Sequence, residues 1–250
     1  MSKAFSATIS KVLNDICHVE RQMALGKIIS SACSINASMR LLSHNRSVNY
    51  FCQSNMSNPK LILGSSSPFR KMLLERLMVP FSTANPDIDE TPLPNESPIE
   101  LVERLAIEKA KAIAANHPNA LIIGSDQVAM HGDEIVGKPH THERAVQQLK
   151  TASGKEIHLY TGLALINSKT GAIQSEVVPF TVHFKELSEQ VIESYLRKEE
   201  PYNCAGSVKS EGLGIALLNR FEGDDPNALI GLPLIRLIAM LENENFSLFE

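Results

Sequence analysis

Side chains suited to binding phosphate follow a short apolar segment near residue 60. Residues 60–64 (Lys-Leu-Ile-Leu-Gly) are succeeded by three serines, Ser65 to Ser67, and then by Pro68 and Arg70. A serine before a proline is typical of a helix start, where free backbone N–H groups attract anions. The serine hydroxyls and the Arg70 guanidinium would add donors for phosphate oxygens. An ordinary capped helix with a surface arginine is the alternative, and the segment lacks the pattern of a P-loop.

Carboxylates that could bind a metal ion or accept a proton occur in two places. Asp87, Asp89 and Glu90 form an acidic turn-like segment, and Asp126 follows the apolar run 120–124 almost directly. Mg²⁺ typically takes one or two carboxylates together with phosphate oxygens. An ionisable residue at the end of a strand is where α/β proteins usually bind ligands, so Asp126 would hold a metal or take a proton from an attacking water. A solvated turn and a helix-capping aspartate are the respective alternatives.

Two lysines and one polar loop add cationic and flexible groups. Lys138 stands between Gly137 and Pro139, which would fix an ammonium against a phosphate, although an exposed turn would have the same sequence. Lys109 lies in a helical pattern, where a surface charge is the usual meaning. The loop 204–212 mixes glycines with charged residues, as substrate loops do. Its cysteine, Cys204, is interpreted as a small buried residue, because no histidine partner is evident.

The elements that must position these residues alternate between strands and helices. Capping patterns predict one helix after Ser67 and another after Ser97, where Glu100 completes a capping box and Pro118 sets the limit. Apolar periodicity adds the remaining elements. We expect strands at 60–64, 120–124, 156–166 and 176–184, a hairpin turn at 169–171, and further helices at 141–149, 188–197 and 233–241. This order predicts an α/β fold in which helices flank a mixed central sheet.

Composition limits the classes of function. The net charge is −4, which argues against a broad nucleic-acid-binding face. Four cysteines without a CxxC pair, three of them in the N-terminal stretch, form neither a disulfide framework nor a zinc site and suit a reduced, cytoplasmic setting. No apolar run approaches the length of about 18 residues that a membrane span needs, so no membrane contact is expected.

The composition changes near Met56. The first 55 residues carry six Lys or Arg against two Asp or Glu and show no catalytic grouping. Three interpretations of this extension stay open: a flexible basic tail, an organelle transit segment, or a mis-assigned start with the natural start at Met56. The third is favoured. We therefore expect an extension at 1–56 and one domain at 57–250.

Taken in order, the motifs resemble the Maf family of nucleotide pyrophosphatases. No single motif is specific, but six or seven in register are, and they cover roughly three quarters of the chain. The motifs are 61–70 (LILGSSSPFR), 89–91 (DET), 105–110 (LAIEKA), 122–128 (IIGSDQV), 137–139 (GKP), 160–162 (YTG) and 231–233 (GLP).

The resemblance implies a cytoplasmic homodimer with an inosine-triphosphatase-like α/β fold and a cleft between two lobes. It implies a nucleoside triphosphate substrate, cleaved to a monophosphate and pyrophosphate, and a divalent cation, Mg²⁺ or Mn²⁺. Asp126 would be the proton acceptor and, with Glu90, a metal ligand. The residues expected to line the phosphate and metal site are Ser65, Ser67, Arg70, Glu90, Lys109 and Lys138.

Three positions bear on the choice of base. Where the branch of the family that acts on dTTP and UTP carries Arg, Thr and Gln, this chain has Phe69, Gln127 and Glu211. It is more similar to the branch that acts on 7-methyl-GTP. N7-methylguanine is cationic, so Phe69 would stack on it and Glu211 would accept hydrogen bonds from its N1–H and N2–H₂ edge. The alternatives are the same chemistry on dTTP, UTP or another modified triphosphate, or a nucleotide-binding regulator of cell division.

Overall fold

The computed structural model describes residues 58–249, and its centre is a seven-stranded mixed sheet. The strand order is β2-β1-β3-β5-β6-β7, with β4 paired to β3. The strands are β1 Lys60–Gly64, β2 Phe81–Ala84, β3 Ala120–His131, β4 Glu134–Ile135, β5 Glu156–Asn167, β6 Ile173–Phe184 and β7 Leu218–Glu222. The predicted extension at 1–56 lies outside the described residues, and the expected domain limit therefore stays a prediction.

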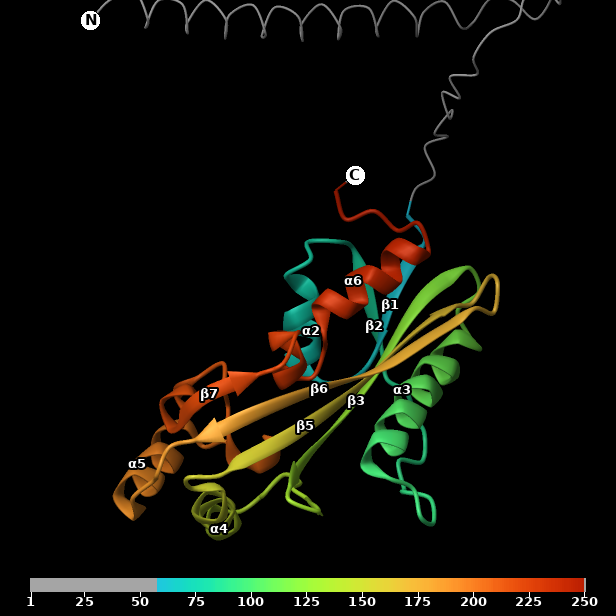
Figure 1. The fold of residues 1–250 in the computed structure, drawn as a ribbon. Helices are drawn as coiled ribbons and strands as arrows, with labels where there is room; N and C mark the ends of the chain where they lie inside the picture. The colour runs from blue at the N-terminus through green and yellow to red at the C-terminus, as the bar shows by residue number, and fades with distance from the viewer. Residues whose placement is uncertain (1–57, 250) are drawn as a thin grey trace, which may run out of the picture. The chain divides into compact units, whose positions relative to one another are not determined.

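The helices flank both faces of this sheet, as Figure 1 shows. They are α2 Pro68–Glu75, α3 Pro98–Ala114, α4 His142–Ala152, α5 Glu189–Glu199 and α6 Leu234–Asn243. Three short 3₁₀ segments join them in the second half: η1 Ala205–Ser207, η2 Leu213–Leu217 and η3 Pro226–Ile230. No helix of the described region is both long and apolar enough to cross a membrane. The prediction of a mixed sheet flanked by helices is confirmed.

The helix starts follow the capping patterns of the sequence. The Ser67 hydroxyl accepts from the backbone N–H of Arg70, with Pro68 at the first helical position of α2. At α3 the capping box is complete, because Ser97 Oγ accepts from Glu100 N while the Glu100 carboxylate accepts from Ser97 N. Each of these bonds satisfies a backbone donor that a helix terminus otherwise leaves free.

Successive side chains of a strand point to opposite faces of the sheet, so the core is divided into separate clusters on the two faces. On one face, Leu61 and Ile123 pack in a cluster with α2 and α6. On the other, Ile62 and Ile122 pack against Ala106 and Ala110 of α3. Further along the first face, α4 and α5 cover β5 and β6. One sheet therefore carries two separate groups of helices on the same face, α2 with α6 and α4 with α5, which agrees with the expected pair of lobes.

The strand expected at 120–124 is longer than predicted, and Asp126 is not at its end. β3 continues to His131, because it pairs with β5 in antiparallel register from Leu121 to Met130. The parallel pairing with β1 does stop at Gly124, opposite Gly64. Beyond this point the edge of β3 is no longer covered by β1. Asp126 therefore lies beside the end of β1, although its own strand, β3, continues to His131.

Candidate active site

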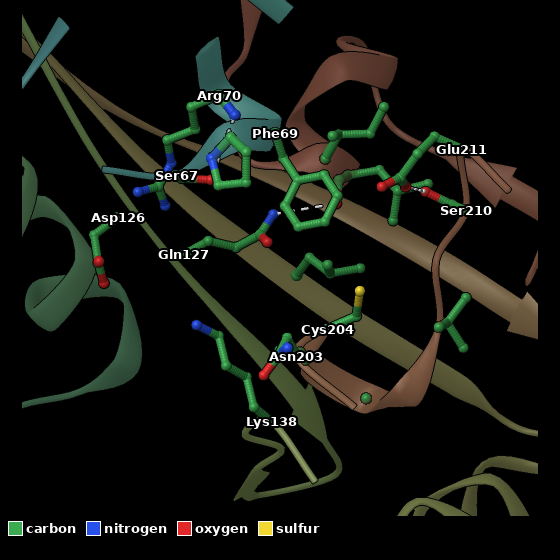
Figure 2. A pocket seen from close by; sticks show the side chains of 18 of the residues that line it. Ser67, Phe69, Arg70, Asp126, Gln127, Lys138, Asn203, Cys204, Ser210 and Glu211 are labelled. Carbon is green, nitrogen blue, oxygen red and sulfur yellow. Dashed lines mark hydrogen bonds between the residues drawn. The ribbon is translucent and has the colours of Figure 1, made fainter. Parts of the chain in front are cut away.

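All ten residues predicted for the site line one cavity of about 680 Å³. The cavity lies where β1 ends beside β3, and loops of the second half of the chain close its other side. In Figure 2, Phe69 stands at the centre, with Asp126 and Lys138 on one side of it and Glu211 on the other. The ten residues are Ser65, Ser67, Phe69, Arg70, Glu90, Lys109, Asp126, Gln127, Lys138 and Glu211. Their individual roles stay predictions.

The donors predicted to bind phosphate gather in the turn between β1 and α2. Ser65 Oγ accepts from Ser67 N at 3.1 Å and lies 3.5 Å from Arg70 Nη1. Arg70 Nε donates to the carbonyl oxygen of Gly231 at 2.8 Å, which aims the guanidinium across the turn. Gly231 has φ +107°, a conformation that side chains rarely adopt, and its oxygen also accepts from Ser125 Oγ at 2.9 Å. The arginine is thus held by the Gly231 carbonyl through Nε and by a long bond from Nη1 to Ser65, and Nη2 can donate to an anion.

The electrostatics of Arg70 fit an anion site. Burial lowers the pKa of this guanidinium, and the nearby carboxylates of Asp126 and Glu90 raise it in part. An arginine stays protonated under such conditions, because its ordinary pKa lies above 12. A half-buried positive charge whose bonds go to one carbonyl oxygen and one hydroxyl gains more from a bound phosphate than a fully exposed one would.

Lys109 joins the two predicted carboxylates. Its ammonium Nζ lies 2.7 Å from Asp126 Oδ1 and 2.9 Å from Glu90 Oε1. Lys109 is only 5% exposed, although the sequence suggested a surface charge. Helix α3 reaches β3 this closely because Gly124 has no side chain: a Cβ there would lie 2.0 Å from the carbonyl oxygen of Ala106. The glycine therefore places the lysine beside Asp126.

The loop that carries Glu90 is tied to α3 by Arg104. The guanidinium makes two bonds to Glu96, Nε to Oε1 at 2.5 Å and Nη2 to Oε2 at 2.8 Å. Nη2 also donates to the carbonyl oxygen of Thr91 at 3.2 Å, next to Glu90. The hydrogen bond from Arg104 lowers the pKa of Glu96 to about 2. This bidentate pair fixes a segment between β2 and α3 that has no regular structure of its own.

The carboxylates of Glu90 and Asp126 fit a divalent cation bound together with phosphate. Both are oxygen donors, and both already contact one cationic group, the ammonium of Lys109. Within residues 58–249, no group of three or more His, Cys, Asp and Glu side chains forms a complete protein cage for a metal. Mg²⁺ commonly takes one or two carboxylates and completes its shell with water and substrate oxygens.

Gln127 and Glu211, the other two residues predicted to set base specificity, lie on either side of the Phe69 ring (Figure 2). Gln127 Nε2 donates to the carbonyl oxygen of Ala228 at 2.6 Å and to Thr161 Oγ1 at 2.9 Å. These bonds use its amide hydrogens, so only its carbonyl oxygen is left for a substrate. Glu211 is exposed at the opposite side of Phe69, and its Oε2 accepts from Ser210 Oγ at 3.4 Å.

Sequence reasoning missed two residues that line this cavity and two buried residues that support it. Cys204, expected to be buried, is half-buried and lines the cavity beside Asn203. Thr161 is fully buried and orients Gln127, and Ser125 helps to hold Gly231. A polar residue at an inward position of an apolar strand was the available signal for Thr161. For Asn203, on an irregular loop, no such signal exists.

Comparisons with known proteins identify the family of this chain. The family model described as Maf-like protein matches residues 60–244. A 7-methyl-GTP pyrophosphatase of Nitrosococcus oceani is 58% identical over 188 residues, which cover 75% of this chain and 94% of that protein. A 7-methyl-GTP pyrophosphatase of Colwellia psychrerythraea is 59% identical over 182 residues, covering 73% and 91% respectively. The matched region contains the whole of the cavity described above, and the chain belongs to the Maf family.

Proposed function

We propose that the protein is a nucleoside triphosphate pyrophosphatase that hydrolyses 7-methyl-GTP to 7-methyl-GMP and diphosphate. The observation that carries this proposal is the group formed by Lys109, Asp126 and Glu90 in the same cavity as Arg70. Two similar proteins that bear the name 7-methyl-GTP pyrophosphatase support it.

Asp126 is the proton acceptor of the proposed reaction. Lys109 holds the Oδ1 oxygen at 2.7 Å, which orients the carboxylate so that Oδ2 can take a proton from water. The water oxygen bonds to the α-phosphorus, the bond between that phosphorus and the bridging oxygen breaks, and diphosphate leaves. Charge neutralisation and in-line positioning supply most of the catalysis in phosphoryl transfer.

The cationic residues bind the triphosphate. Arg70, with the serine hydroxyls of the turn, contacts phosphate oxygens from one side of the cavity, and Lys138 does so from the exposed opposite wall. Glu90 and Asp126 would hold Mg²⁺ or Mn²⁺, and the cation would supply further neutralisation of the phosphate charge. These carboxylates also repel a triphosphate that arrives without a cation, which gives the reaction its expected metal dependence.

The base is recognised at the other end of the cavity. A methylated guanine carries a positive charge, and Phe69 offers an aromatic face to it while Glu211 offers a carboxylate. Unmethylated GTP would gain less from both groups. The resulting preference would make the enzyme a scavenger that keeps methylated nucleotides out of RNA, acting as a cytoplasmic homodimer.

The test is the release of diphosphate from a panel of 7-methyl-GTP, GTP, dTTP, UTP and CTP, with Mg²⁺ or Mn²⁺ and with a chelator. Strong preference for 7-methyl-GTP, lost with the chelator, is expected. Turnover of dTTP or UTP instead would keep the mechanism and refute the assignment of the base pocket. A folded protein that binds nucleotide and releases no diphosphate would refute the enzyme and favour a regulator.

A further inference from the structure

The carboxylate assigned to base recognition stands on an irregular loop. Glu211 lies between the short 3₁₀ segments η1 and η2, and its side chain is exposed. A charge on a mobile loop discriminates poorly between substrates, because each contact must offset the entropy of ordering the loop. The loop therefore needs a support if Glu211 is to select a base.

That support is Glu199, in the last turn of α5. Its Oε1 accepts from Lys209 Nζ at 2.7 Å, and its Oε2 accepts from the backbone N–H of Leu213 at 2.7 Å. The two oxygens of one carboxylate thus hold both ends of the segment 209–213. The Glu199 side chain is only 13% exposed, so these bonds are shielded from water better than a surface ion pair.

The backbone of the loop closes around the same point. Lys209 N donates to the hydroxyl of the buried Tyr195 at 3.0 Å, and Lys209 O accepts from the N–H groups of Gly212 and Gly214 at 3.1 Å each. A side chain at Gly212 would begin 2.7 Å from Glu199 Oε2. The loop therefore packs directly on the carboxylate, and the position of Glu211 depends on it.

Glu199 also determines which carboxylate the Lys209 ammonium pairs with. The ion pair with Glu199 raises the pKa of Lys209, and the nearby Glu211 contributes to the same shift. If Glu199 lost its charge, the ammonium would be free to pair with Glu211, two residues away on the same loop. A Glu211 carboxylate paired with the Lys209 ammonium would attract a cationic base less strongly.

We propose that Glu199 and Lys209 are positioning residues for base specificity: they hold the 209–213 loop and keep Glu211 oriented toward the base, because the Lys209 ammonium pairs with Glu199 instead of Glu211. Neither residue lines the cavity, so both act through Glu211. The proposal rests on the proposed function for the identity of the base, and it predicts effects on base preference rather than on hydrolysis.

The test compares wild type with Glu199→Gln, Glu199→Ala and Lys209→Met in two assays. The first is kcat and KM for 7-methyl-GTP and for GTP, and the second is equilibrium binding of 7-methyl-GMP and GMP, which requires no turnover. Glu189→Gln is the matched control, because Glu189 lies on the same helix and pairs with Lys150 at the surface. Thermal denaturation shows whether each variant is folded, and Glu199→Gln keeps an acceptor for Leu213 if the alanine variant does not fold.

The expected result is a loss of preference for the methylated base by about tenfold in both assays, the size of one hydrogen bond to a charged group. The loss should come from a higher KM for 7-methyl-GTP, with kcat for GTP unchanged and the Glu189→Gln control like wild type.

Unchanged preference in the folded Glu199 variants would overturn the proposal, as would a uniform fall of kcat on both substrates. A wild type that releases no diphosphate but prefers 7-methyl-GMP, with this preference lost in the variants, would refute the enzyme and still support the positioning role. Equal binding of both monophosphates by a wild type that hydrolyses both triphosphates equally would overturn the proposal.

Discussion

Replacing Gly124 with alanine should move helix α3 and thereby damage both stability and catalysis. The new Cβ would lie 2.0 Å from the carbonyl oxygen of Ala106, and 2.9 Å and 3.0 Å from the backbone nitrogen and Cβ of Ala110. These atoms belong to the helix backbone or sit directly on it, so no flexible side chain can yield. Relieving the overlap requires a movement on the order of 1 Å.

The size of both effects follows from this movement. Overpacking of a core typically costs about 1–3 kcal/mol, which lowers Tm by roughly 2–12 °C for a domain of this size. Lys109 lies between the two contact residues on α3, and its Nζ is 2.7 Å from Asp126. A displacement near 1 Å at a catalytic group can reduce the rate by about 100-fold. We expect kcat to fall by more than the unfolded fraction accounts for.

Two other glycines provide controls. At Gly162 a Cβ would lie 2.1 Å from the carbonyl oxygen of Val102, against the same helix but seven residues before Lys109. Gly162→Ala should lower Tm similarly and kcat less. At Gly137 a Cβ would meet nothing within 4 Å, so Gly137→Ala should keep the wild-type Tm. Differential scanning fluorimetry and diphosphate release measure both quantities. A Gly124→Ala protein with wild-type Tm, or with lowered Tm and wild-type kcat, would refute this account of how Lys109 is placed.

Three further predictions concern single carboxylates. Asp126→Asn should lower kcat by about 100-fold or more, while calorimetry shows nucleotide still bound; wild-type turnover would exclude Asp126 as proton acceptor. Glu211→Gln should reduce the preference for 7-methyl-GTP over GTP by about tenfold, and an unchanged ratio of kcat/KM would contradict the base-pocket assignment. The Arg104 hydrogen bond lowers the pKa of Glu96 from 4.5 to about 2, so the stability that Glu96 contributes is complete above the unfolded value and is lost as pH falls toward 2. Tm of the wild type should therefore exceed that of Glu96→Gln above about pH 5 and approach it in acid; a pH-independent difference would exclude this linkage.

The helices were predictable from sequence because their signals are local. A serine followed by a proline marks the starts of α2 and α3, and both caps form the expected bonds within four residues. The turn residues at 169–171, which lie between two apolar segments, similarly predict the hairpin of β5 and β6. In each case the stabilising partner lies close in the chain, so the sequence pattern contains it.

Two strands that were missed, β2 and β7, depend on partners elsewhere in the chain. β2 is largely exposed and pairs only with β1, and β7 pairs only with β6, so neither needs an apolar run. The second half of β3 was missed because Ser125, Asp126 and Gln127 resemble a polar strand end. Each of these side chains has a specific polar partner in the fold, which lets the strand continue through polar residues.

The site was predictable only in part for the same reason. The turn at Ser65 and the carboxylate of Asp126 followed from local pattern, because an apolar strand precedes each. That Lys138 and Glu211 face the same cavity came from the family resemblance, since both lie on loops far along the chain. The burial of Lys109 was not predictable locally, because it results from the missing side chain at Gly124 on another element.

The two ends of the cavity are supported differently, and this has a consequence for substrate choice. Lys109 projects from a helix and Asp126 from a strand, and the backbones of these two elements are in direct contact at Gly124. Few substitutions at this contact would leave both side chains in place. Glu211 stands on a loop that the Glu199 carboxylate holds at both ends, with one further bond to the Tyr195 hydroxyl. On the proposed assignment, a change at Glu199 would alter base preference without moving Asp126, the proposed proton acceptor. We therefore expect that base preference can change while the proposed hydrolytic group at α3 and β3 stays in place.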